Sequence, residues 1–286
     1  MDFKKIEWIF FLAFLGLNIF LFSIFHDAQT EATNVTSTNQ KIDIATRLKE
    51  DDITFNGELS GEQPEGYYLS AEQTDLAAAL TNEREKTGND ELLATGTSFE
   101  DDLLNHVIYE EYVVNEENPQ ASIADFLASE DQVLYGSEYT YQPVFSVLDA
   151  EYPELIASQS FEGVPFHDVT SQIEISLGTQ DDQYRLQKYT QSHISNIEKL
   201  REKMKLYSEK EALNTLYTNN KIPSDSTILW SQLGYTLILQ VREKNVYVPA
   251  WFVAIQTGEA TPQVEIVNAV NNRIITNNSL QQVENS

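Results

Sequence analysis

Histidines are the side chains of this 286-residue chain best suited to acid–base or metal chemistry, and they lie far apart in the sequence. The chain has four of them: His26, His106, His167 and His193. None stands in an HExxH pattern or a comparable spacing that would bring two imidazoles to one metal ion. Only His167-Asp168, with Glu162 nearby, could form a base or a metal site. Because adjacency in sequence is the only support for such a site, a surface loop is the preferred interpretation. We therefore predict no catalytic residue and no metal ligand.

Other patterns that carry chemistry are absent or incomplete. The runs Glu50-Asp51-Asp52 and Glu100-Asp101-Asp102 could bind calcium, but they lack the alternating ligands and central glycine of an EF-hand loop, so we interpret them as solvated faces. The chain has no cysteine, which excludes disulfides, thiolate metal sites and a cysteine nucleophile. It contains no GxSxG, P-loop or GxGxxG motif. We expect no bound cofactor.

Aromatic residues gather near the C-terminal part of the sequence. The group consists of Trp230, Tyr235, Tyr247 and Trp251. Aromatic side chains on paired strands mostly belong to a core, because they bury a large apolar area there. A binding face for a ligand or a partner, built from the same residues, stays open as an alternative.

Charge is distributed unevenly along the chain. It has 18 Lys+Arg against 45 Asp+Glu, a formal net charge of −27. So acidic a surface repels the phosphates of nucleic acids, and we expect no nucleic-acid partner. Two lysines balance two acidic residues within residues 1–26, so this segment carries no net charge and the whole −27 lies beyond it.

Residues 8–25, WIFFLAFLGLNIFLFSIF, form an uncharged apolar run. As a helix, at about 1.5 Å per residue, the run is roughly 27 Å long, close to the roughly 30 Å hydrocarbon layer of a membrane. It is long for a cleaved signal peptide and lacks the polar stripe of a buried core helix, so we predict an uncleaved transmembrane signal anchor. Lys4 and Lys5 precede it, which keeps residues 1–7 in the cytoplasm and sends the C-terminal domain out of the cell.

Asn18 is the strongly polar side chain within this predicted span. An amide in hydrocarbon gains by hydrogen bonding to a partner helix, so Asn18 is our candidate transmembrane contact residue, although a lone tolerated asparagine is an equal alternative. Trp8 is expected at the cytoplasmic interface of the membrane and is our second candidate for a partner contact.

Beyond the span, the pattern predicts an α+β fold in two lobes. Residues 26–45 are polar and aperiodic, which is typical of a flexible tether. We place a first α+β lobe at 46–149, a second at 150–280 and a polar tail at 281–286. In each lobe, helices are expected to pack on antiparallel sheets.

Local signals predict several elements within these lobes. Helix starts are expected at three sets of capping residues: Ser70 with Gln73, Asn118 with Pro119, and Ser208 with Glu211. Alternating apolar residues predict a hairpin over 173–186 and a meander of antiparallel strands over 227–276. Pro249 within the meander indicates an edge strand or a bulge.

Several segments together resemble the YycI (WalI) family of regulatory proteins from low-GC Gram-positive bacteria. The N-terminal MDFKKIEWIFFLAFLGLNIFLF is similar to the start of that family, with an asparagine deep in the span. Further similar segments follow in the family's order: RLKEDDITF, SEKEALNTLYTNNKIP, LGY, VYVPAWFVAI and EIVNAVNNRII.

The resemblance implies a single-pass membrane protein with a two-lobed α+β ectodomain of the YycH/YycI kind. It also implies two partners, a YycH-like membrane protein and a sensor histidine kinase of the WalK (YycG) type that controls cell-wall metabolism. A non-enzymatic regulator is therefore the leading hypothesis. An extracytoplasmic lobe that binds a ligand or peptide, and a cell-surface enzyme acting on wall polymers, are the alternatives.

Overall fold

The computed structural model describes Phe14, Asn18 and residues 43–148, 152–241, 244–276 and 281–282. The chain divides into two compact units, Met1–Asp51 and Asp52–Ser286, which are described separately. Among the described helices, none combines the length and the apolar character needed to cross a membrane.

The first unit contains helix α2 (Ile44–Glu50), which buries Ile44 and Leu48 one turn apart. Phe14 and Asn18 are helical and exposed. The rest of the predicted anchor at 8–25, Trp8, the N-terminus at 1–7 and nearly all of the tether lie outside the described residues.

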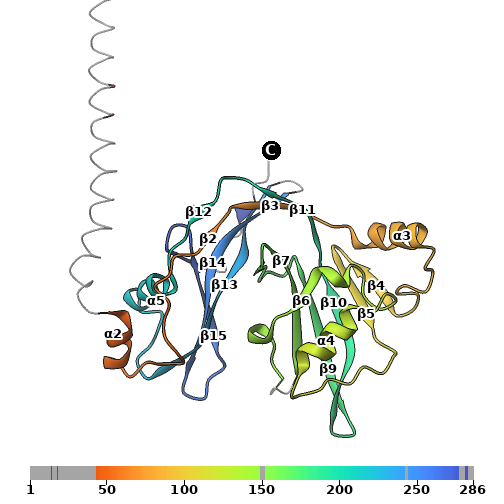
Figure 1. Cartoon of the computed structure of the whole chain (residues 1–286), viewed down its shortest axis with the longest axis horizontal. Coiled ribbons are helices and arrows are strands. Elements are labelled where there is room, and N and C mark those ends of the chain that lie inside the picture. Colours follow the sequence, from red (N-terminus) through yellow and green to blue (C-terminus); the bar gives the residue numbers. More distant parts are fainter. Residues whose placement is uncertain are drawn as a thin grey trace, which may run out of the picture. The chain divides into compact units, whose positions relative to one another are not determined.

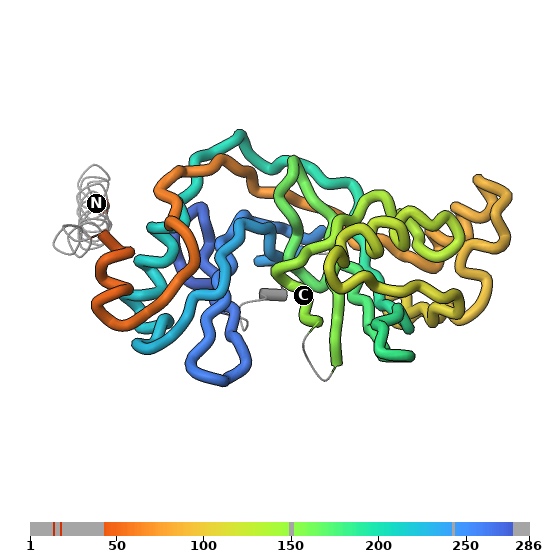
Figure 2. Tube along the Cα trace, turned by 60° about the horizontal axis from the view of Figure 1, so that its bottom comes forward, coloured from red at the N-terminus to blue at the C-terminus, as the bar shows by residue number. Residues whose placement is uncertain are grey.

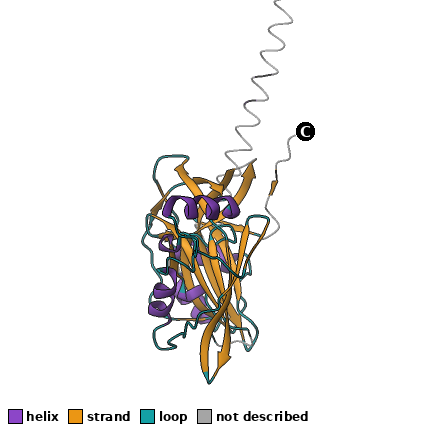
Figure 3. Ribbon diagram, turned by 90° about the vertical axis from the view of Figure 1, so that its right-hand side faces the viewer, coloured by secondary structure: helices purple, strands orange, loops and turns teal. Residues whose placement is uncertain are grey.

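The second unit is built mainly from strands, as Figure 3 shows by colour. It has two main sheets, which we name sheet I and sheet II, with helices packed on them, so the α+β class predicted from the sequence is confirmed. Sheet I contains β1 (Thr54–Phe55), β3 (Leu69–Gln73), β11 (Ile194–Lys199), β13 (Ser226–Val241), β14 (Lys244–Thr257), β15 (Gln263–Asn268), β16 (Arg273–Ile275) and β17 (Gln281–Gln282). Sheet II contains β4 (Thr97–Glu100), β5 (Leu103–Val107), β6 (Tyr139–Tyr141), β7 (Glu154–Phe161), β8 (Val164–Pro165), β9 (Gln172–Gln180) and β10 (Gln183–Gln191).

Both sheets are mostly antiparallel. Sheet I follows the order β1-β13-β14-β15-β16, with β3 joining β14 to β11, and sheet II follows β4-β5-β10-β9-β7-β6. Only β1 and β17 among the described strands pair in parallel, both with β13. A small sheet pairs β2 (Glu65–Gly66) with β12 (Met204–Lys205). Figures 1 and 2 show the orange segment with β2 and β3 beside the teal segment with β11 and β12.

The division between the sheets does not coincide with the predicted lobe boundary at residues 149 and 150. Sheet II spans that position, because β6 pairs with β7 and β5 pairs with β10. Sheet I takes strands from both ends of the second unit, so sheet II is an insertion between β3 and β11. Alternation of apolar side chains identifies a strand but not its partner, which is why the boundary could not be placed from the sequence.

Helices α3 (Leu76–Thr87) and α4 (Pro119–Leu127) share a core with sheet II. Ile123 and Phe126 of α4 pack with Leu104 and Ile173 of the sheet, and all four side chains are fully buried. Helix α5 (Glu209–Thr218) buries Ala212, Leu213 and Leu216. Two short 3-10 turns, η1 (Gly136–Glu138) and η2 (Pro143–Phe145), flank β6.

Two of the three predicted helix starts are confirmed. The Asn118 side chain accepts the Ala121 N–H at 3.3 Å in front of Pro119. Ser208 and Glu211 form a complete capping box at α5. The third was wrong: Ser70 and Gln73 belong to strand β3, and Asp75 caps α3 instead. The pairing of β3 with β11 and β14 outweighs the local capping pattern.

The predicted hairpin is confirmed as β9 and β10, with Asp181 and Asp182 at positive φ in its turn. The meander is confirmed as β13 to β16. Pro249, however, lies in neither an edge strand nor a bulge, because β14 is a central strand. On one side, β3 pairs with Lys244 to Tyr247 and β15 pairs from Ala250 onward, so the proline falls between these two partners. Its carbonyl still accepts the Ala269 N–H at 2.9 Å.

Candidate functional site

Sheets I and II are joined by a set of buried polar and aromatic contacts, which we call the joint. The chain passes from β3 to α3 at Thr74 and Asp75, and returns from β10 to β11 at Ser192 and His193. These two connections touch, since the Thr74 N–H donates to the His193 carbonyl at 2.9 Å. A third contact comes from the segment after β8, where Phe166 bridges to Tyr235 of β13.

His193 lies at the centre of the joint with both ring nitrogens engaged. Its Nε2 is 3.0 Å from a Glu138 carboxylate oxygen, and its Nδ1 is 2.8 Å from the Thr74 hydroxyl. A carboxylate only accepts hydrogen bonds, so Nε2 carries the proton and Nδ1 accepts from the Thr74 O–H. Burial lowers the pKa of His193 below its ordinary value, and Glu138 partly offsets this. The histidine is therefore neutral near pH 7.

Further amides extend this polar network to both sheets. Gln159 of β7 accepts the Ile194 N–H at 2.9 Å and donates to the Ile194 carbonyl at 3.0 Å. Gln73 of β3 donates to the His193 carbonyl at 3.1 Å, and the Asn245 side chain donates to Gln73 at 3.2 Å. Buried amides satisfied in this way fix one relative register of the two sheets.

His167 forms the aromatic part of the joint. Its ring stacks on Phe145 at 3.5 Å between centroids, and meets Phe252 edge-on at 4.6 Å. Its Nδ1 is buried without a hydrogen-bond partner. Desolvation lowers the pKa of His167 to about 4, so the ring is neutral at pH 7.

The Asp168 side chain binds backbone amides and is not placed to act in catalysis. Its carboxylate accepts the Leu237 N–H of β13 at 3.1 Å and the Thr170 N–H at 3.1 Å. Burial raises the pKa of Asp168, and these hydrogen bonds oppose the rise. Glu162 is engaged elsewhere, in an ion pair of 2.6 Å with Lys199. His167 and Asp168 lie in the loop between β8 and β9, as expected, but their side chains are only partly exposed and pack into the joint.

The predicted aromatic face is divided between core and surface. Tyr235 and Tyr247 are 2% and 0% exposed, and the Tyr247 hydroxyl lies 2.6 Å from that of Thr170. Trp230 and Trp251 are half-buried. The Trp230 ring lies 5.1 Å from that of Phe145, and the Trp251 indole donates to the Tyr207 carbonyl at 2.8 Å. Two of the four side chains therefore belong to the core, and the other two are partly exposed.

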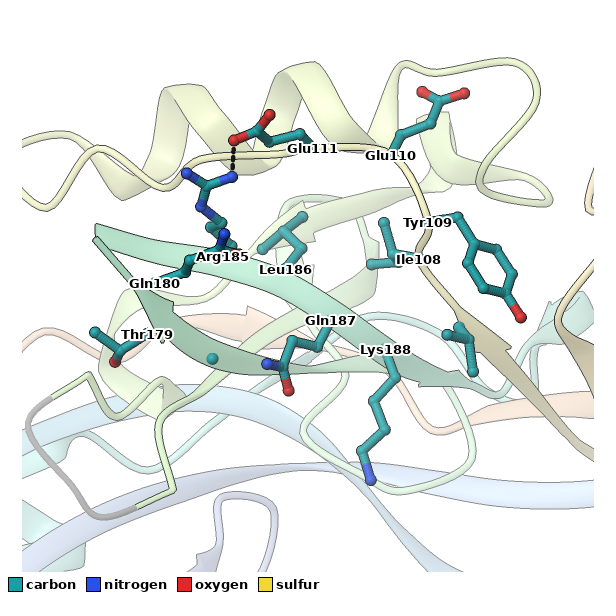
Figure 4. Close-up of a pocket in the computed structure, with 12 residues that line it drawn as sticks. Ile108, Tyr109, Glu110, Glu111, Thr179, Gln180, Arg185, Leu186, Gln187 and Lys188 are labelled. Atoms are coloured by element: carbon teal, nitrogen blue, oxygen red, sulfur yellow. Dashed lines mark ion pairs between the residues drawn. The ribbon is translucent and has the colours of Figure 1, made fainter. Parts of the chain in front are cut away.

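A groove of about 670 Å³ lies on sheet II beside the β9–β10 hairpin (Figure 4). The Ile108 N–H donates to the Gln187 carbonyl, and the Leu186 N–H donates to the Tyr112 carbonyl. Residues 109–111 therefore do not pair with β10, and they form one wall of the groove. Opposite them, the Gln187 side chain lies against Gly178, where a Cβ atom would come within 1.7 Å of its amide nitrogen.

The groove offers contact groups rather than a catalytic pair. Figure 4 shows Glu111 and Arg185 pointing toward each other, and they form an ion pair. Tyr109 is 71% exposed, and Lys188 is exposed beside it. Across the part of the chain that the structure describes, no group of metal-ligating side chains could hold a metal ion.

Sequence reasoning considered His167, Asp168 and His193 only as possible catalytic or metal-binding groups, predicted no such site, and did not find the network that joins His193 to both sheets. Thr74 and Glu138 were missed, because each lies far in sequence from His193 and neither belongs to a recognisable motif. The one local signal is the polar run Gln191-Ser192-His193 between two strands. All three of its side chains are buried.

Similarity to known proteins is found among solved structures and family models. The solved structures similar to the chain include an uncharacterized protein from Eubacterium rectale ATCC 33656, at 8% identity and a TM-score of 0.41, over 79% of this chain and 91% of that chain. The comparison with curated proteins gave no match. The family model described as YycI protein matches residues 31–270, nearly the whole of the second unit. The chain therefore belongs to the YycI protein family.

Proposed function

We propose that this chain is a membrane-anchored, non-enzymatic regulator of a WalK/YycG-type sensor histidine kinase, acting together with a YycH-like partner. The family match over residues 31–270 carries this proposal. YycI proteins are membrane-associated regulators of the two-component system that contains such a kinase, and they are not enzymes. Anchoring by residues 8–25, a cytoplasmic N-terminus and an extracellular C-terminal domain are parts of the same proposal.

Regulation of this kind requires differential binding. A partner shifts a kinase between two conformational states only if it binds one state better than the other, by a few kcal/mol for a large shift. The acidic surface beyond residue 26 favours protein partners with basic or neutral docking faces over anionic polymers. The net charge of −27 thus supports a protein partner rather than direct attachment to the cell wall.

The residues that the alternative of a cell-surface enzyme would require have other contacts. His167 is stacked between aromatic rings, and Asp168 is committed to two backbone amides. Glu162 pairs with Lys199 instead of approaching the histidine. A hydrolase needs a base within hydrogen-bond reach of a reacting group, and these three residues do not provide one.

Asn18 offers the sharpest test of the transmembrane contact. The full-length chain is extracted in detergent with its kinase and YycH-like partner, and co-purification is compared between the wild type, Asn18→Leu and Asn18→Gln. Because an interhelical amide contact is worth roughly 0.6–2 kcal/mol, Asn18→Leu is expected to reduce recovery of a partner by about 3-fold to 30-fold. Asn18→Gln retains an amide and serves as the matched control.

Recovery of neither partner with the wild-type chain would contradict the proposed assembly. Equal recovery with all three chains would retain the assembly but remove Asn18 from its contact surface.

A further inference from the structure

Each of the three segments that link sheets I and II carries a buried or partly buried histidine, or touches one. The connection from β10 to β11 carries His193, and the connection from β3 to α3 meets that residue through Thr74. The segment between β8 and β9 carries His167, whose backbone N–H donates to the Tyr235 carbonyl of sheet I at 2.9 Å. Both imidazoles are therefore placed where separation of the sheets would expose them to water.

We propose that the joint is a proton-sensitive device: uptake of protons by His167 and His193 loosens the contact between sheets I and II and so reports acidity to the partner proteins. The regulatory consequence rests on the proposed function, whereas the opening itself is a property of this chain alone.

The surroundings of His167 disfavour its charged form. Phe145 lies flat against the ring, Phe252 lies edge-on to it, and Nδ1 has no acceptor in reach. A second ring proton would sit on that buried nitrogen without a partner, which is costly in an apolar site. Asp168, the next residue in the chain, is titratable, and its carboxylate accepts hydrogen bonds from backbone amides.

The surroundings of His193 are more balanced. Glu138 faces Nε2, and the rings of Tyr135 and Tyr139 lie 5.0 and 6.2 Å from the imidazole. Glu83 and Lys86 of α3 act on Tyr135 with opposite signs. Protonation of Nδ1 would force the Thr74 hydroxyl to give up its present role as donor. Burial outweighs the attraction of Glu138, so the pKa of this histidine also stays below its ordinary value.

The direction of the pH effect follows from these two pKa shifts. A histidine whose pKa is lower in the closed joint than in water binds a proton more readily when the joint is open, so falling pH favours opening below about pH 6.5. Asp168 acts in the opposite direction, because burial raises its pKa and closed joints therefore take up its proton more readily as the pH falls.

The size of the effect can be bounded from His167. With a pKa of about 4 in the closed joint and 6.5 when hydrated, its protonation raises the ratio of open to closed joints by about 30-fold between pH 7.5 and pH 5. His193 adds to this in the same direction.

The absence of cysteine makes a direct distance measurement feasible. Ser98→Cys on β4 and Val264→Cys on β15 introduce one exposed labelling site on each sheet. The spin-labelled full-length chain, reconstituted in nanodiscs without kinase, is measured by pulsed electron resonance at pH 7.5 and pH 5. We expect a second, longer distance population to grow as the pH falls.

Two variants and one control assign the change to the joint. His167→Phe keeps a planar ring against Phe145, and His193→Gln keeps polar groups near Glu138; each is expected to reduce the growth of the longer population, and the double variant to abolish it. His106→Gln is the matched control, because His106 is also buried and bonded to a threonine, but inside sheet II. It should leave the longer population unchanged relative to the wild type.

An unchanged distance distribution in the wild-type chain between pH 7.5 and pH 5 would overturn the proposal, as would opening that persists in the double variant. If the double variant does not fold, the single variants and the ring proton signals of His167 and His193 in the wild-type chain decide the question. Ordinary pKa values near 6.5 for both rings would contradict the proposal. None of these results depends on the kinase, so they leave the proposed regulatory function to its own test.

Discussion

The molecule contains two hydrogen bonds of equal length between a threonine and a histidine, and they lie in different places. Thr97 and His106 lie 2.8 Å apart on neighbouring strands of sheet II, and Thr74 and His193 lie 2.8 Å apart on the two connections of the joint. Burial lowers the pKa of both histidines. The difference is the group on the other side of the ring: an amide from Gln132 for His106, a carboxylate from Glu138 for His193.

The two histidines also differ in what surrounds them: His106 lies inside one sheet, and His193 lies between two. His106 packs against the Tyr189 ring, which belongs to the apolar core of sheet II, so it does not link two sheets. His193 lies where the two sheets meet through hydrogen bonds, beside a smaller apolar cluster in which Phe166 packs on Tyr235. Polar contacts of this kind specify one arrangement but resist its loss only modestly, which suits the proposed opening of the joint.

The largest effect is expected in the apolar core of sheet II. Phe126 is fully buried, and its ring meets those of Tyr112 and Tyr189 at 5.1 and 5.8 Å. Phe126→Ala should lower the free energy of unfolding by about 3–5 kcal/mol, measured by urea denaturation. The inter-sheet distance at pH 7.5 should not change before unfolding begins. A cost below about 1 kcal/mol would show that this core does not stabilise the sheet as described.

The two threonines allow a smaller and more discriminating comparison. Thr74→Val and Thr97→Val each remove one hydroxyl from a histidine, at a cost of about 1 kcal/mol. Only Thr74→Val should raise the open population of the joint at pH 7.5, by about 5-fold in the labelled chain. Equal effects of the two substitutions on that population would contradict the distinction drawn between the regions.

The smallest effect concerns the carboxylate beside His193. The Glu138 side chain is 51% exposed, so solvent screens its charge. Glu138→Gln removes the group that raises the pKa of His193, and the closed joint then takes up a proton less readily. Acid opening should therefore become more pronounced, by about 2-fold to 3-fold at pH 5 in the distance measurement. Weaker opening than in the wild type would mean that the carboxylate does not stabilise the protonated ring.

Much of the fold could be predicted because its signals are local. Ser208 and Glu211 lie within one helical turn, and the Asn118-Pro119 start lies within two residues, so sequence spacing determines both contacts. The hairpin and the meander follow from alternation between sequence neighbours.

The failures share a physical cause, which is pairing between distant segments. Ser70 and Gln73 carry a capping pattern, but β3 gains more by pairing with β11 and β14, which lie more than a hundred residues away. The joint could not be predicted for the same reason: Thr74 and His193 are separated by 119 positions and Glu138 and His193 by 55. No periodicity in the sequence encodes such meetings.

The most direct test of the central proposal is the autophosphorylation rate of a WalK/YycG-type kinase in proteoliposomes that contain a YycH-like partner. Adding the full-length chain should change that rate, and Asn18→Leu should abolish most of the change while Asn18→Gln retains it. A kinase rate that is the same with and without the chain would contradict the proposed regulatory function.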